Sequence, residues 1–258
     1  MMDHEHESRE ESCTSTHGFR VAMYNVHGWI GTDSQQIPQR TLGVIKEMNC
    51  DIVGLQEATF SLESREELTE DYLRKVTGME PVLGPTLYKS PLYFGNVLLT
   101  RFPIHKVRRY DLTVSTFEPR GALDVELSCQ GVGIRVLVTH LGLKIRERRR
   151  QMNLLLERVT EEHRGCIILM GDFNEWFLPR YAHRNLHTIF GFPPSPRTYP
   201  ARFPLFAIDR IWVHPSTSLM TMNAWRTEQA RVASDHLPVL ADIFLSAEVP
   251  VMRRAFAP

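Results

Sequence analysis

The 258-residue sequence lacks the features that mark several large classes of protein. It contains no run of about 18 apolar residues, as a membrane-spanning helix requires, and its first residues lack the apolar core of a secretory signal. Acidic and basic residues number 30 each, so there is no net charge to hold nucleic acid by bulk electrostatics alone. We therefore expect a cytoplasmic protein without a transmembrane segment.

Cysteine is scarce as well. The four cysteines, at positions 13, 50, 129 and 166, show no CxxC spacing, and three of them sit in or beside apolar segments. This pattern does not predict a disulfide framework or a cysteine-rich zinc site. Reduced structural thiols are the simplest interpretation.

What the sequence does have is enough apolar residue, 43%, to fill the core of one large domain. Residues 1–18 are polar and charged and cannot bury enough surface to order themselves, so we assign them to an N-terminal tail. The domain is expected over 19–247 and a C-terminal tail over 248–258. No internal repeat or long linker divides the chain.

The most informative stretch is the apolar run Ile167–Met170, which Gly171 and the polar pair Asp172 and Asn174 follow directly. Such a run predicts a fully buried strand that ends in a turn. Residues two apart on a strand face the same side, so Asp172 and Asn174 should point together beyond the strand's carboxyl end. Taken alone, both residues are equally well explained as turn formers.

Several other apolar runs stop at a side chain that is able to bind a metal or a phosphate. These are the runs that end in Asn25, Glu57, His140 and Asp209, and a further pair, Asp235 and His236, opens a strand. Charged groups at the ends of buried strands are costly unless they are paired or bound to a metal. The repetition therefore predicts a common site.

The periodicity of the chain predicts an α/β fold. Helices are expected over 36–48, 63–76, 145–162 and, briefly, 181–189; strands are expected over 19–24, 51–56, 93–100, 107–112, 121–127, 134–139, 167–170, 206–213, 219–225 and 237–245. This order suggests two mixed sheets packed face to face with helices outside, so that strand ends from both halves of the chain meet at one edge.

These motifs, in this order, resemble the endonuclease/exonuclease/phosphatase superfamily. The resemblance rests on Tyr-Asn-Val-His-Gly at Asn25, Leu-Gln-Glu at Glu57, Thr-His-Leu at His140, Gly-Asp-Phe-Asn at Asp172 and Asn174, Ile-Asp-Arg-Ile at Asp209, and Ser-Asp-His at His236, and it runs from about residue 19 to 245. It implies a DNase I-like, four-layer α/β sandwich and Mg²⁺- or Mn²⁺-dependent hydrolysis of phosphoesters. Stretches at 120–124 and 197–201 are most similar to bacterial members of undefined substrate.

The chemistry of phosphoester hydrolysis suggests a role for each residue. Mg²⁺ prefers hard oxygen ligands, so we expect Glu57 to bind the metal, with Asn25 as a neutral oxygen and Asp235 holding a second cation or tuning the first. Asp172 is the candidate base for a metal-bound water that attacks phosphorus in line, and Asn174 should hold that water or a phosphate oxygen.

Two histidines complete the expected set. His236 should donate a hydrogen bond or charge to the scissile phosphate, with Asp209 pairing to it and raising its pKa. His140 should contact the phosphate from another side. Arg120 is a further candidate for phosphate binding; the alternative is an exposed loop arginine without a role in the site.

The sequence leaves three functions open. A phosphodiesterase or phosphatase acting on a small or lipid-linked phosphate fits the neutral charge. His140 resembles the nuclease, sphingomyelinase and inositol-phosphatase branches more than the apurinic-site endonucleases, which argues against a base-excision role. A DNA or RNA nuclease of the same superfamily and a binding module that has lost turnover are the alternatives. The complete set of site residues argues against the silent module. Oligomeric state cannot be read from the sequence.

Overall fold

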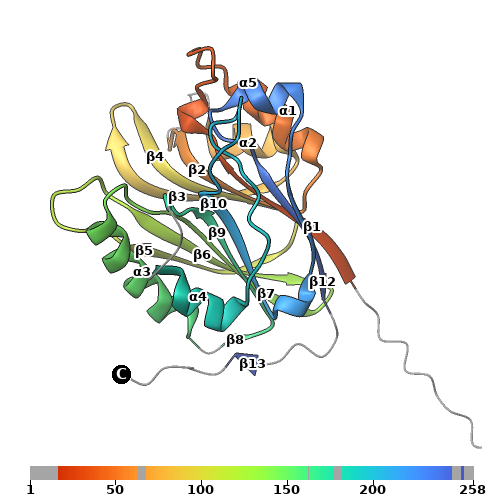
Figure 1. The fold of residues 1–258 in the computed structure, drawn as a ribbon. Coiled ribbons are helices and arrows are strands. Elements are labelled where there is room, and N and C mark those ends of the chain that lie inside the picture. Colours follow the sequence, from red (N-terminus) through yellow and green to blue (C-terminus); the bar gives the residue numbers. More distant parts are fainter. Residues whose placement is uncertain (1–16, 63–67, 162, 177–181, 246–250, 253–258) are drawn as a thin grey trace, which may run out of the picture.

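The computed structural model describes residues 17–62, 68–161, 163–176, 182–245 and 251–252, and two mixed sheets packed face to face make up its centre (Figure 1). The first sheet has the order β11 (Leu219–Ala224), β12 (Val239–Leu245), β1 (His17–Asn25), β2 (Ile52–Phe60), β4 (Leu92–Thr100), β3 (Glu80–Lys89). The second has the order β10 (Asp209–His214), β9 (Cys166–Asp172), β7 (Val132–His140), β6 (Gly121–Cys129), β5 (Ile104–Asp111).

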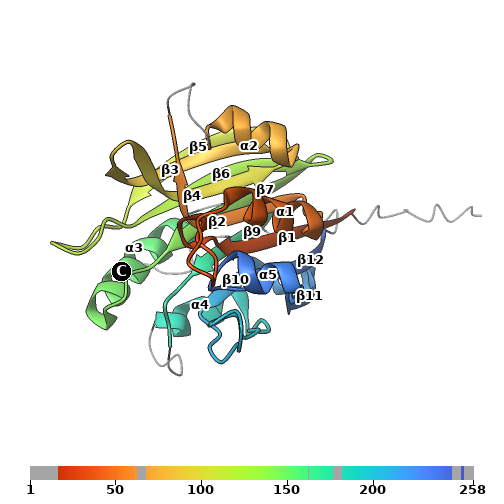
Figure 2. The same cartoon turned by 90° about the horizontal axis from the view of Figure 1, so that it is seen from above.

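Helices cover the outer face of each sheet (Figure 2). The first sheet packs against α1 (Pro38–Met48), α2 (Glu70–Thr77) and α5 (Glu228–Ala233), and the second against α3 (Ile145–Val159) and α4 (Ala182–Phe190). Short elements complete the fold: η1 (His27–Trp29), η2 (Ser216–Ser218) and a two-stranded sheet of β8 (His163–Arg164) and β13 (Val251–Met252). The predicted four-layer α/β sandwich is confirmed.

Strand β9 shows why its sequence is apolar at every position. Ile168 and Met170 pack into the core between the two sheets, whereas Ile167 and Leu169 pack into the core beneath α3 and α4. Successive strand residues point to opposite faces, so a strand in the middle of a four-layer fold buries both of its faces. The alternation along β9 thus identifies Ile168 and Met170 as the residues that face the opposite sheet.

Three expectations about secondary structure were wrong or incomplete. β3 was not predicted, because Pro81, Gly84 and Pro85 read as breakers, but it is the last strand of its sheet, where proline is tolerated. α5 is only one and a half turns long and was also missed. The predicted helix over 63–76 is observed from Glu70, and its residues 63–67 lie outside the described part of the chain.

The described part of the chain has no helix that is both long and apolar enough to cross a bilayer. The cysteines at positions 50, 129 and 166 are buried and free, which confirms the prediction of reduced thiols for these three.

β9, the strand that carries Asp172, lies very close to β7 at Gly171. A Cβ at Gly171 would lie 1.9 Å from the backbone oxygen of Thr139 on β7, whereas a Cβ at Gly131, in the β6–β7 turn, would meet nothing within 4 Å. Both glycines have positive φ. Gly131→Ala should lower the free energy of unfolding by about 1–2 kcal/mol, and Gly171→Ala by at least about 3 kcal/mol, since overpacking adds to the strain.

Urea denaturation of the two variants measures this difference. Equal losses of stability would contradict the close approach of β7 and β9 at Gly171.

Candidate active site

The side chains that face between the sheets turn polar at one edge of the fold. In β9, Ile168 and Met170 are apolar and Asp172, the next residue in the same phase, ends the strand. β1 ends in the same phase with Asn25, and β7 with His140. The strand alternation that builds the core therefore also delivers these side chains to one place.

Asn25 links the two sheets at this edge. Its Nδ2 donates hydrogen bonds to Glu57 Oε1 at 3.0 Å and to Asp172 Oδ2 at 3.1 Å. Its Oδ1 accepts a hydrogen bond from the backbone N–H of His27, which fixes the amide's orientation. Asn25 thus presents its nitrogen to the two carboxylates, and it would bind a cation through Oδ1 only if the amide turned.

We predicted that Glu57 follows the end of a strand. It lies instead inside β2, where a β-bulge directs it to the site. The pairing of β2 with β4 shifts register between Leu55 and Ala58, and Glu57 has a φ of 55°. Leu55 and Ala58 both pack toward the helices, so the alternation changes phase across the bulge. Bulges beside active sites commonly re-aim a side chain, and here the bulge turns Glu57 toward Asn25.

His140 is fixed by Arg120. The guanidinium Nη1 of Arg120 lies 2.8 Å from His140 Nδ1, and both side chains are buried. Arginine only donates, so Nδ1 is the acceptor and the neutral ring carries its proton on Nε2. That atom lies 3.6 Å from Asp172 Oδ2 and 3.9 Å from Glu57 Oε1. Burial and the Arg120 charge hold the pKa of His140 well below its usual range.

Asn174 sits in the turn after β9 with a φ of 51°, a conformation that asparagine tolerates. Its backbone N–H donates to Asp172 Oδ1 at 2.8 Å, and its Nδ2 donates to the carbonyl of Leu141 at 2.9 Å. The same Nδ2 lies 3.1 Å from His140 Nε2. Because Nε2 of His140 carries a proton, this contact joins two N–H groups and is not a hydrogen bond, so the turn fixes Asp172 and places Asn174 beside His140.

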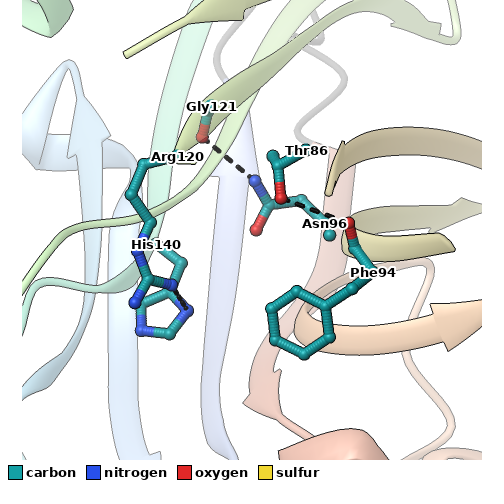
Figure 3. Close-up of a pocket in the computed structure, with 7 residues that line it drawn as sticks. Thr86, Phe94, Asn96, Arg120, Gly121 and His140 are labelled. Carbon is teal, nitrogen blue, oxygen red and sulfur yellow. Dashed lines mark hydrogen bonds between the residues drawn. The ribbon is translucent and has the colours of Figure 1, made fainter. Parts of the chain in front are cut away.

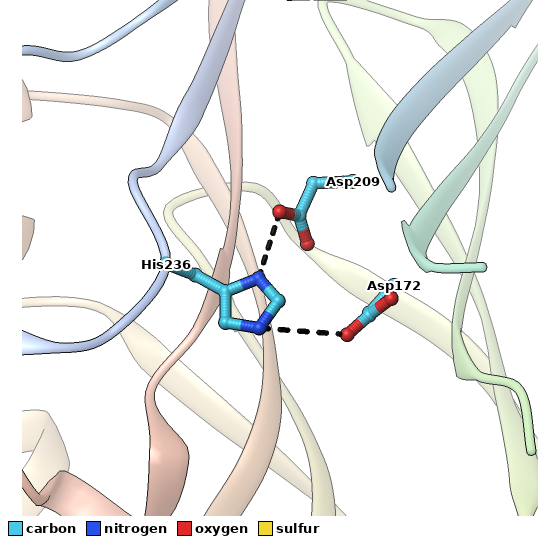
Figure 4. A group of neighbouring side chains, drawn as sticks. All are labelled: Asp172, Asp209 and His236. Atoms are coloured by element: carbon cyan, nitrogen blue, oxygen red, sulfur yellow. Dashed lines mark hydrogen bonds and ion pairs between the residues drawn. The ribbon is translucent and has the colours of Figure 1, made fainter. Parts of the chain in front are cut away.

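Asp209 and His236 form a buried pair on the other side of Asp172 (Figure 4). His236 Nδ1 lies 2.8 Å from Asp209 Oδ2, and His236 Nε2 lies 3.8 Å from Asp172 Oδ2. Asp209 begins β10, whereas we predicted a strand over 206–213 that contains it, and the antiparallel register sets it opposite Asp172. An antiparallel strand brings its start to its neighbour's end, which the sequence pattern alone did not resolve.

The protonation of this group follows from burial and charge. Burial disfavours a charged imidazole, but the Asp209 carboxylate and its hydrogen bond outweigh it and raise the pKa of His236 to about 10. Burial, reinforced by the charge of Asp209, raises the pKa of Asp172 to about 7. At neutral pH the site thus combines a cationic His236, a neutral His140 and a carboxyl group near its midpoint.

Asp235 is half-buried in the loop before β12. Its Oδ1 lies 3.4 Å from His27 Nδ1 and 3.4 Å from Ser234 Oγ, whose hydroxyl donates to the backbone oxygen of Asn25 at 2.8 Å. The carboxylate therefore neighbours the Asn25 loop, and its role as a metal ligand stays a prediction.

Sequence reasoning missed three residues around the site. Thr198 Oγ1 donates to Asp209 Oδ2 at 2.5 Å, and the Tyr199 ring lies 4.8 Å from the ring of His236. Asn96, in β4, is buried between the sheets, and its Nδ2 donates to the carbonyl of Gly121. Thr198 and Tyr199 lie in the stretch 197–201 that resembles bacterial members of the superfamily, and Asn96 is a polar residue inside an apolar strand run, but none of the three was assigned to the site.

Two sets of donors are able to hold a cation. Ligand atoms of Asp172, Asp209 and His236 lie within 4.8 Å of one another, but His236 and Asp209 already pair. Glu57 and Asp172 converge on one amide, and no lysine or arginine of the described residues forms a salt bridge with either. Two such carboxylates suit a hard divalent cation, which would supply further positive charge if it bound there.

Two mixed sheets between helices, with carboxylates and imidazoles at one edge, define the DNase I-like class of α/β sandwich. A model of the endonuclease/exonuclease/phosphatase family matches residues 36–236, and the chain belongs to this family. The uncharacterized protein YbhP of Escherichia coli (strain K12) is 31% identical over 255 residues, covering 90% of this chain and 98% of its own length.

Solved structures agree with the fold. The endonuclease/exonuclease/phosphatase from Beutenbergia cavernae DSM 12333 aligns with a TM-score of 0.70 at 20% identity, covering 89% of this chain and 72% of that one. The mannosyl-6-phosphatase Bt3783 of Bacteroides thetaiotaomicron VPI-5482 aligns with a TM-score of 0.68 at 18% identity, covering 88% and 99%. The expected superfamily is confirmed.

The Asp209–His236 pair allows a direct test by titration. Asp209→Asn removes the charge that keeps His236 protonated, so burial should dominate and the pKa of His236 should fall from about 10 to below the ordinary 6.5. NMR titration of the imidazole measures the change. Asp242→Asn, a partly exposed carboxylate paired with Arg20, is the control and should leave the His236 titration as it is. An unchanged pKa in Asp209→Asn would reject the pairing.

Proposed function

We propose that the protein is a Mg²⁺-dependent phosphoester hydrolase. The observation that carries this proposal is the surroundings of Asp172: its Oδ2 accepts from Asn25 and lies within 4 Å of His140 and His236. The groups come from both sheets and combine acid, amide and imidazole. In-line attack of water on phosphorus needs a base, groups that stabilise developing charge and groups that orient the water and the phosphate, and these side chains are able to supply all three.

The ligands predicted from the sequence are Glu57, Asp235 and Asn25, the last only after its amide turns, and the convergence of Glu57 and Asp172 on Asn25 adds the Asp172 carboxylate to the set that would hold the cation. Mg²⁺ keeps several of its waters, so one or two carboxylates are enough, and Mn²⁺ suits the same oxygen ligands. When bound, the cation neutralises charge that develops on the transferred phosphoryl group.

The remaining steps belong to the chain's own residues. Asp172 is the group that accepts a proton from the attacking water; burial and the charge of Asp209 raise its pKa to about 7 when no cation is bound, and a bound cation would lower it. His236, kept cationic by Asp209, donates a hydrogen bond to a phosphate oxygen or to the leaving group. His140, neutral and protonated on Nε2, donates from another side, and Asn174 holds the attacking water or a phosphate oxygen.

A phosphatase or phosphodiesterase acting on a small or lipid-linked phosphate is the favoured reaction. The zero net charge supports it over a nuclease, and the fold shared with a protein named mannosyl-6-phosphatase is compatible with it. A panel of phosphoesters with and without a chelator tests the proposal, comparing sugar phosphates, phospholipid head groups and nucleic acids. We expect turnover that EDTA abolishes and added Mg²⁺ restores; no turnover of any ester would contradict it.

Glu57→Gln should weaken Mg²⁺ binding while leaving the fold nearly intact. The substitution removes a ligand charge from a half-buried position without removing volume. We expect the Mg²⁺ concentration for half-maximal activity to rise at least about tenfold. The parallel variant Asp235→Asn tests the other predicted ligand. An unchanged Mg²⁺ dependence in either variant would remove that residue from the ligand set.

His236→Ala should reduce kcat by roughly 10² or more, because it removes the cationic donor from the phosphate site. Circular dichroism checks that the fold persists. His105→Ala is the matched control, since His105 is exposed and bonds to Ser128 at 2.7 Å, and it should turn over normally. A near-normal kcat in His236→Ala would reject the assigned role.

A further inference from the structure

A small recess opens between the two sheets beside His140. It is lined by Thr86, Phe94, Gly95, Asn96, Arg120, Gly121 and His140, and its empty volume is about 170 Å³ including the open mouth (Figure 3). The space within it that is open to a water-sized group is only about 10 Å³, so the recess accommodates one small functional group of a ligand and not a whole molecule.

The amide of Asn96 sets the hydrogen-bonding character of the recess. Its Nδ2 donates to the carbonyl of Gly121 at 3.0 Å, and because a carbonyl only accepts, the orientation of the amide is fixed. Its Oδ1 is therefore turned toward the space between the Phe94 ring and the Arg120–His140 pair, as Figure 3 shows. Asn96 is only 2% exposed, and no described residue donates a hydrogen bond to this oxygen.

Leaving a buried acceptor without a donor is unfavourable, so a group that donates to Asn96 Oδ1 is favoured in the recess. Arg120 lines the same recess and is a permanent cation, which disfavours an ammonium group there. An ionised phosphate oxygen would pair with Arg120, but it carries no hydrogen and cannot donate to Asn96 Oδ1. A hydroxyl group satisfies both neighbours, because it donates to the amide oxygen and turns its lone pairs to the guanidinium.

His140 places this recess close to the reacting phosphate. One edge of its ring is held by Arg120, and the Nε2 edge lies 3.6 Å from Asp172 Oδ2. If the phosphate of a ligand lies among Asp172, His140 and His236, the carbon atoms next to its ester oxygen therefore lie beside the recess.

We propose that the recess binds a hydroxyl group of the substrate's alcohol, so that the protein hydrolyses phosphoesters of polyhydroxylated alcohols, such as sugar or polyol phosphates. This rests on the proposed function and narrows its substrate class. Asn96 is then a specificity-determining residue that recognises the alcohol and not the phosphate.

Matched pairs of phosphoesters test the proposal with the wild-type protein and saturating Mg²⁺. Mannose 6-phosphate is compared with cyclohexylmethyl phosphate, and glycerol 3-phosphate with propyl phosphate, so that each pair differs in hydroxyl groups and not in the phosphate. We expect kcat/KM to favour the hydroxylated member by roughly 10- to 100-fold, since the bare ester leaves Asn96 Oδ1 unpaired. Equal values within both pairs would overturn the proposal.

Asn96→Leu then locates the preference. It keeps the approximate volume and removes the acceptor, so the ratio of kcat/KM values within each pair should fall toward one. Thr86→Val alters the lining of the same recess at a hydroxyl that already donates to the Phe94 carbonyl, and it should keep the ratio. A ratio that survives in Asn96→Leu, with both esters slowed equally, would show a structural role only and overturn the proposal.

Different results would contradict the proposed hydrolase function and the proposed hydroxyl recess. A wild-type protein that hydrolyses neither member of any pair contradicts the proposed function. One that hydrolyses both members equally leaves the function standing and rejects the hydroxyl recess.

Discussion

The burial of one carboxylate governs the rest of this structure. Asp172 is 2% exposed at the end of a strand whose other side chains are all apolar. A carboxylate in that position is stable only if neighbouring groups take over the role of water. Asn25 from the opposite sheet, the turn at Asn174 and the cationic His236 do so in part. The divalent cation that we propose, shared with Glu57, would supply the rest.

The same constraint explains why the two histidines differ. Both are buried and both lie within 4 Å of Asp172 Oδ2, yet His236 is paired with an aspartate and His140 with an arginine. The Asp209 carboxylate raises the pKa of His236, whereas burial and Arg120 lower that of His140. Environments that push similar groups apart in pKa separate their roles in catalysis. In the reaction that we propose, His236 would carry charge to the phosphate and His140 would act as a neutral donor.

Much of this arrangement was predictable because one rule builds both the core and the site. Strand alternation, read from runs such as Ile167–Met170, correctly anticipated that Asn25, His140 and Asp172 would meet. The rule failed where the backbone departs from it. The bulge at Glu57 and the antiparallel start of β10 at Asp209 arise from pairing between distant strands, which no local pattern contains. Asn96 was overlooked because a single polar residue in an apolar strand has no distinctive spacing.

The central claim is that a cation sits between the sheets, shared by Glu57 and Asp172. Crystals soaked in Mn²⁺ and measured at the manganese absorption edge locate such an ion directly. The account predicts an anomalous peak within bonding distance of oxygen atoms of both carboxylates. A peak at Asp209 and His236 instead, or none near Glu57, would contradict it.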